Sequence, residues 1–116
     1  LVIPSDVIKE ELLFSISADI AQTPILIPSE SGLFEVTAYA VCTVLGAAIV
    51  SFSLIFNDGV LNRTVPLLGD LGLAAVGNYV SSPQIIRASE GSTVFYSVDF
   101  DVPGGSLDLW IRVKPV

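Results

Sequence analysis

The sequence contains no histidine and no methionine, and its single cysteine is Cys42. Without histidine, no Ser-His or Cys-His pair can form an activated nucleophile, and no histidine can hold a metal ion. Cys42 has no disulfide partner and lies on the apolar side of an alternating segment, where a small buried side chain is expected. The 12 acidic residues can always supply two carboxylates for a glycosidase, yet solvated charge is their commoner role. We therefore expect no enzymatic activity and no cofactor.

Basic residues are scarce as well, with 5 lysines and arginines against 12 aspartates and glutamates and a net charge of −7. Such a chain repels phosphate backbones, so we expect no nucleic-acid partner. Charged residues between Asp6 and Glu11 interrupt any apolar run near the start, so no signal peptide is predicted. Because the sequence begins at Leu1 without a methionine, we expect a processed or truncated N-terminus.

Helical periodicity is also missing. Residues 36–57 carry no charge, and a run of about 20 apolar residues is enough for a membrane-spanning helix. Apolar side chains nevertheless recur at every second position, from Phe34 to Val44 and again from Val50 to Phe56. A period of two is typical of a strand with one buried face. We predict two strands of a β-hairpin that reverses at residues 45–47, and no membrane association.

Further short apolar segments, most of them alternating, follow the same pattern and are separated by turn signals, at residues 12–20, 23–28, 60–67, 78–87, 93–102 and 106–114. Asp58-Gly59 predicts a two-residue turn, and the glycine-rich residues 68–77 predict a connection that crosses between sheets. The pattern predicts an all-β protein, a single antiparallel β-sandwich that is jelly-roll-like and has about eight strands. Residues 1–31 are expected to form an N-terminal arm and the first strands, and residues 32–116 the sandwich core, in one domain overall.

Apolar residues make up 52% of the chain and the mean hydropathy is +0.75, more than a small core can hide. We therefore expect a homo-oligomer or a docked subunit. The alternation places three aromatic side chains outward, which allows a subunit interface, cover by the chain itself, or stacking on a glycan. With apolar residues of the arm and first strands, they complete the candidate interface: Tyr39, Phe95, Trp110, Leu1, Val2, Ile3, Ile25 and Ile27.

Three outward aspartates, Asp99, Asp101 and Asp108, are expected near one tight turn. Oxygen ligands of this kind suit Ca²⁺, but the spacing lacks a dedicated binding loop. Pairing with Arg112 or Lys114 across neighbouring strands is the simpler expectation. We therefore predict no metal site.

Residues 32–39, Gly-Leu-Phe-Glu-Val-Thr-Ala-Tyr, resemble the Gly-Leu-Tyr-Arg-Val-Ser-Ala-Tyr start of a recurrent β-sandwich domain in tailed-phage virion proteins. Five further pieces resemble that domain in the same order: the Asn-Asp-Gly turn at 57–59, Pro-Leu within 65–68, Ile-Ile-Arg within 85–88, Thr-x-x-Tyr-Ser at 93–97 and Leu-Trp-Ile-Arg-Val at 109–113. The resemblance covers residues 32–116, and residues 1–31 lie outside it.

This resemblance implies a structural virion protein with a jelly-roll-like sandwich. The leading expectation is a capsid decoration or cement protein that forms a homotrimer on the major capsid protein and stabilises the shell. Its location would be the capsid surface of the virion, and the host cytoplasm during assembly. The alternative is a fibre-tip or tail-fibre module that binds a host receptor or glycan. The resemblance carries no binding residues over to this chain.

Overall fold

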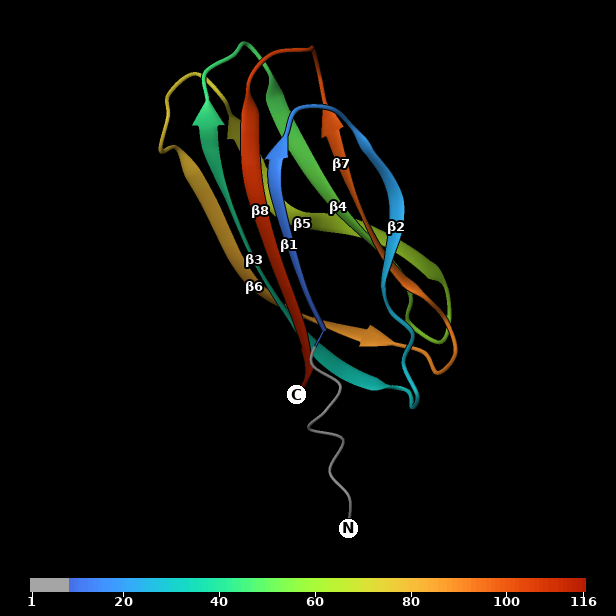
Figure 1. The fold of residues 1–116 in the computed structure, drawn as a ribbon. Helices are drawn as coiled ribbons and strands as arrows, with labels where there is room; N and C mark the ends of the chain where they lie inside the picture. Colours follow the sequence, from blue (N-terminus) through green and yellow to red (C-terminus); the bar gives the residue numbers. More distant parts are fainter. Residues whose placement is uncertain (1–8) are drawn as a thin grey trace.

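Eight strands and no helix make up the described part of the chain, residues 9–116 of a computed structural model. They form two antiparallel four-stranded sheets that pack face to face, with strand orders β1-β8-β3-β6 and β2-β7-β4-β5 (Figure 1). The strands are β1 (Lys9–Ile16), β2 (Ile20–Leu26), β3 (Gly32–Val44), β4 (Ile49–Asn57), β5 (Asn62–Gly72), β6 (Tyr79–Ala88), β7 (Val94–Phe100) and β8 (Ser106–Pro115). The predicted all-β, jelly-roll-like sandwich is confirmed.

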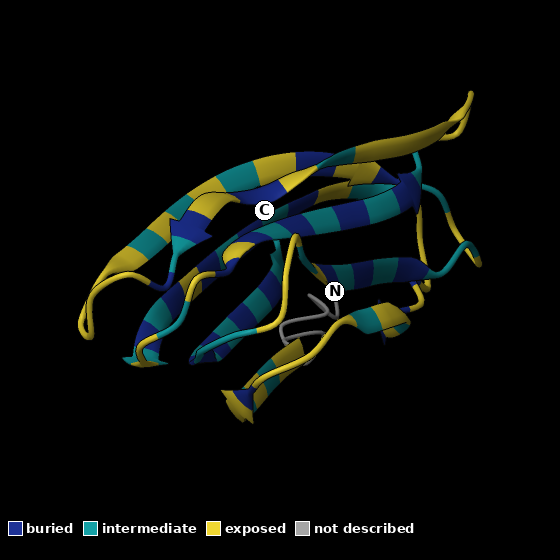
Figure 2. Cartoon of the chain, turned by 90° about the horizontal axis from the view of Figure 1, so that it is seen from above, coloured by how far each residue is buried: buried dark blue, intermediate teal, exposed yellow. Residues whose placement is uncertain are grey.

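The core lies between the two sheets and follows from the alternation. Buried and less buried positions alternate along the strands, as Figure 2 shows by colour. Successive side chains leave opposite faces of a pleat, so every second residue of each long strand enters the core. The largest fully buried side chains are Phe52, Leu54, Leu67, Leu73, Leu107, Leu109, Ile111, Val36, Val50, Val94, Val98 and Val113. Cys42 is buried and free, as expected.

The predicted hairpin between β3 and β4 is wrong. β3 pairs with β6 and β8, whereas β4 pairs with β5 and β7, so the two strands face each other across the core. Their period of two indicates which side chains are buried but not which strand lies beside them. The connection crosses between sheets at Gly46, where a Cβ would overlap the backbone of Gly104 and Gly105 in the β7–β8 loop.

The β4–β5 hairpin is present, but its turn is longer than predicted. The last pair is Asn57 with Asn62, which leaves the four residues from Asp58 to Leu61 in the loop. The Asp58 carboxylate accepts hydrogen bonds from the backbone N–H groups of Val60 and Leu61, both at 2.8 Å. This side chain satisfies amides that a two-residue turn would have paired across the strands. β5 then continues to Gly72, so the crossing to β6 is shorter than the predicted 68–77.

The first strand predicted from the sequence, over residues 12–20, is two strands. β1 ends at Ile16 in one sheet, and β2 begins at Ile20 in the other. Ser15 has a φ of 54°, and the pairing with β8 shifts between Leu13 and Ile16. Leu12 and Phe14 consequently point outward while Ile16 enters the core. β7 likewise ends at Phe100, before the end of the predicted segment 93–102, and Val102 is exposed.

Proline occupies three of the four edge strands. Pro24 lies in β2, Pro66 in β5 and Pro83 in β6, whereas β1 contains none. Proline has no N–H to donate, so it hinders the pairing of a further strand and is tolerated at edges. Pro24 and Pro28 favour a sheet edge or a strand end for residues 23–28, and β2 does lie at an edge of its sheet. Among the four edges, only β1 is free of this hindrance.

No helix in the described residues is long and apolar enough to cross a membrane.

Candidate functional site

The outer surface of the β1-β8-β3-β6 sheet carries a cluster of aromatic and apolar side chains. Tyr39 of β3 and Trp110 of β8 are register partners, and Trp110 in turn pairs with Leu12 of β1. Phe14 and Tyr79 lie on the same surface, one on each edge strand. We call this cluster the aromatic face, and it consists of Leu12, Phe14, Tyr39, Tyr79 and Trp110.

The rings of the aromatic face are held in place by local contacts. Tyr39 and Tyr79 stack with ring centroids 5.5 Å apart and an interplanar angle of 23°. The indole N–H of Trp110 donates a hydrogen bond to Glu10 Oε1 at 2.5 Å. Leu12, Phe14 and Tyr79 are 56%, 66% and 62% exposed. Three large side chains are therefore more than half exposed on this surface, beside rings that stacking and a hydrogen bond hold in place, as on many contact surfaces.

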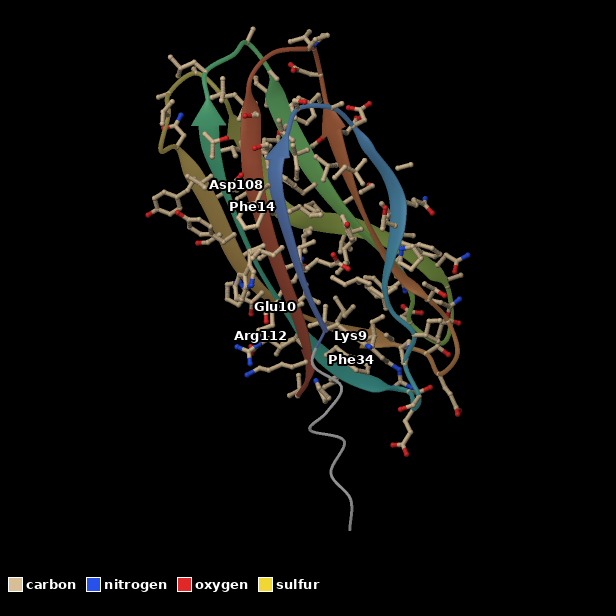
Figure 3. All side chains as sticks on the ribbon, in the orientation of Figure 1. Lys9, Glu10, Phe14, Phe34, Asp108 and Arg112 are labelled. Atoms are coloured by element: carbon tan, nitrogen blue, oxygen red, sulfur yellow. The ribbon has the colours of Figure 1, made fainter. Side chains whose placement is uncertain are left out.

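Charged residues flank the aromatic face on one side. Arg112 lies in register with Glu10, and Figure 3 shows both at the same end of the β1 and β8 strands. One row further, Lys114 Nζ lies 3.5 Å from Glu35 Oε1. Within residues 9–116, Arg112 Nε is buried and has no hydrogen-bond partner. An apolar centre with mixed charges at its margin is typical of a protein–protein interface.

The outer surface of the other sheet is built differently. Ser51 and Ser53 of β4 are register partners of Asp99 and Ser97 of β7. We call these four residues the serine face. Two hollows adjoin it, one of about 470 Å³ that reaches Asp19 and β2, and one of about 270 Å³ that reaches β5. The serine face thus carries small side chains beside open hollows, whereas the outer surface of the other sheet carries large rings.

The predicted aromatic set is divided between the two surfaces. Tyr39 and Trp110 lie together, but Phe95 lies on the far sheet, half-buried between its register partners Pro24 and Ile55. The alternation correctly placed all three outward but could not say which sheet each strand joins.

Two aliphatic residues of the candidate interface, Ile25 and Ile27, differ in burial. Ile27 is 64% exposed just after β2. Placing Ile25 at an interface is wrong, because its side chain is buried in the core. Leu1, Val2 and Ile3 lie outside the described residues.

Three members of the aromatic face were not predicted from the sequence. Leu12 and Phe14 alternate with Ile16 as if all three shared a side, and no residue signal marks the register shift at Ser15. Tyr79 could have been found, because it precedes the exposed Ser81 and Pro83 at every second position of β6.

The three outward aspartates do not converge. Asp101 Oδ1 accepts a hydrogen bond from the backbone N–H of Ile49 at 2.7 Å, and Asp108 Oδ1 accepts one from Ser15 at 2.9 Å. Within the described residues, no group of three or more aspartate, glutamate, cysteine or histidine side chains is placed to hold a metal ion. The carboxylates instead fix the ends of strands.

Asp58 is the carboxylate whose pKa departs most clearly from its usual value. Hydrogen bonds from the Leu61 backbone, the Arg63 side chain and the Val60 backbone stabilise the charged form and lower its pKa. Arg63 Nε lies 2.6 Å from Asp58 Oδ2, and Arg87 Nε donates to the Asp58 carbonyl oxygen at 3.2 Å. The hairpin loop is thus held through one ionised side chain and presents Val60 and Leu61 to solvent.

The chain matches no protein-family model and no curated protein. One similar solved structure is a carbohydrate-binding module, CBM6cm-2, from Cellvibrio mixtus lichenase 5A in complex with cellotriose. The two chains are 17% identical, with a TM-score of 0.43, and the match covers 94% of this chain and 87% of that one. The fold assignment above rests on the strand pairing of this chain itself.

Proposed function

We propose that this protein is a structural subunit of a tailed-phage virion. It decorates the head as a homotrimer, contacts the major capsid protein and strengthens the shell without catalysing a reaction. It acts at the capsid surface of the virion, after assembly in the host cytoplasm. The single observation that carries this proposal is the aromatic face, a fixed and exposed apolar surface on an otherwise acidic molecule. The ordered sequence resemblance over residues 32–116 supports the phage assignment.

The geometry of the aromatic face favours a protein partner over a glycan. Tyr39 and Tyr79 stack on each other, so part of each ring surface is already occupied. Their neighbours on the same surface, Leu12 and Phe14, are purely apolar and offer a sugar no hydrogen bond. Four hollows in residues 9–116, among them the two beside the serine face, are lined by other residues than those of the aromatic face.

Trimer formation explains how a weak contact of each subunit with the shell can give tight binding overall. The aromatic face reaches β1, the edge strand without proline, so neighbouring copies and the shell have both a surface and an edge to contact. A trimer offers three linked contacts to the shell. Once one subunit is bound, the others bind at a high effective concentration, and avidity of about 10²-fold or more follows without any new contact.

The proposal is tested on heads of the phage that encodes the chain, prepared without it. Wild-type protein is expected to bind these heads and to raise the temperature at which they release DNA. Trp110→Ala, which removes the central ring, is expected to bind weakly and stabilise little. Val60→Ser removes an apolar side chain that is 80% exposed in a distant loop and should behave as wild type. Wild-type protein that leaves the heads unbound would contradict the capsid function.

A further inference from the structure

A groove crosses the outer surface of the β2-β7-β4-β5 sheet, on the side opposite the aromatic face. The hollow of about 470 Å³ and the hollow of about 270 Å³ share Ser51 and Ser53, so they adjoin each other across β4, one on the side of β2 and one on the side of β5. The floor of the groove is low because the central positions carry serine. Asp19 stands at one end and Asp70 at the other.

The floor presents hydrogen-bonding groups that the chain does not use. Within residues 9–116, the hydroxyls of Ser53 and Ser97 make no side-chain hydrogen bond, and that of Ser51 reaches only the Asp99 carbonyl oxygen, at 3.5 Å. Each hydroxyl can donate one hydrogen bond and accept two, and the exposed Asp99 carboxylate accepts several. The backbone groups of β4 and β7 are already paired in the ladder. A ligand must therefore pair with side chains alone, which suits a polyhydroxyl compound better than a peptide.

An apolar row borders the polar floor. Phe95 lies two residues before Ser97 on the same surface of β7, in register with Ile55 and Pro24. A sugar ring has apolar C–H faces and a hydroxyl-bearing rim, so it needs apolar and polar groups side by side. The half-buried Phe95 ring and the adjacent serines provide both.

The acidic residues of the groove limit which saccharides it can bind. Asp19, Asp70 and Asp99 line the groove, and no lysine or arginine lines either hollow. Carboxylates this close repel acidic sugars and phosphate groups. We propose that this groove binds a neutral saccharide chain. The inference does not rest on the proposed capsid function, because the groove and the aromatic face belong to opposite surfaces and can be occupied together.

Affinity electrophoresis in gels that contain a neutral polysaccharide tests the inference, with dextran, mannan and a β-glucan as neutral probes and alginate as the acidic one. Wild-type protein is expected to be retarded by at least one neutral probe and not by alginate. Ser53→Ala with Ser97→Ala removes two hydrogen-bonding hydroxyls, and we expect binding about tenfold weaker. Ser53→Trp fills the floor of the groove and should abolish retardation.

Ser81→Ala is the matched control, because it removes an exposed serine from the outer surface of the other sheet. It should bind as wild type, and unchanged thermal unfolding should show that all variants are folded. Lack of retardation by every neutral probe would overturn the inference. So would groove variants that bind as wild type, because the sugar would then lie elsewhere. Neither outcome concerns binding to phage heads, so failure of this inference is distinguishable from failure of the capsid function.

Discussion

The two outer surfaces of this sandwich differ although their inner surfaces are alike. Both sheets bury aliphatic side chains against each other, as Ile111 of β8 and Leu54 of β4 do. Outside, one sheet carries the aromatic face and the other the serine face. The fold requires only that the inner surface be apolar, so the outer residues are free to reflect what each surface contacts. This difference is the basis of our two proposals, a protein partner on the aromatic face and a polar ligand on the serine face.

The largest expected effect comes from comparing an inward with an outward residue of β8. Ile111→Ala creates a cavity in the core and should lower the free energy of unfolding by about 2–5 kcal/mol. Trp110→Ala changes the adjacent residue, which points outward, and should lower it by only about 1 kcal/mol, mainly through the lost bond to Glu10. Urea unfolding at protein concentrations low enough to dissociate the trimer measures both losses for the single chain. Equal losses would mean that Trp110 belongs to a core rather than to a contact surface.

A second comparison places the same charge on each outer surface. Tyr39→Lys buries an unpaired ammonium in the proposed interface and should weaken subunit association by about 2 kcal/mol or more. Ser51→Lys, on the serine face, should leave association unchanged. Sedimentation over a concentration series gives both dissociation constants. If Ser51→Lys separates the subunits and Tyr39→Lys does not, the two surfaces have been assigned the wrong way round.

The junction between the two sheets offers a smaller effect. Gly46→Ala forces the β3–β4 crossing away from Gly104 and Gly105, and we expect a loss of about 1–3 kcal/mol of stability. Gly69→Ala is the matched control, since a Cβ there meets no atom within 4 Å. Thermal unfolding compares the two variants. Equal stability of both would contradict the close approach of the loops.

The smallest expected effect is the response of the hairpin loop to acid. The folded-state pKa of Asp58 lies below its unfolded value of about 3.8, so its contribution to stability is present above that value. It is lost as the pH falls from there toward the folded-state pKa. Amide hydrogen exchange at Val60 and Leu61 should therefore accelerate below about pH 3.8, relative to intrinsic rates, more than at Ser53 on the serine face. Parallel changes at all three amides would indicate global unfolding instead.

Residue periodicity was enough to predict the fold class and most of the core. It predicted β3, β4 and β8 and the side each one buries, because burial of one face is a local property of a strand. It could not predict strand neighbours, because β3 and β4 are equally amphipathic whether they pair or face each other. The sites of failure are places where one residue changes the local geometry, namely the positive φ at Ser15 and the carboxylate of Asp58.

The candidate site was predicted only in part for the same reason. Tyr39 and Trp110 were recognised as outward, but their contact depends on β3 and β8 being neighbours. Phe95 was grouped with them because sequence gives the side of a strand and not the sheet that it joins. The serine groove was missed entirely, since isolated serines on outward positions are ordinary in any strand.

The mass of the native protein in solution tests the central claim most directly, that the aromatic face joins copies of this chain. Light scattering at micromolar concentration should give three times the 12.2 kDa of one chain for the wild type, and a value close to one chain for Tyr39→Lys. A wild-type mass of a single chain under these conditions would contradict the account.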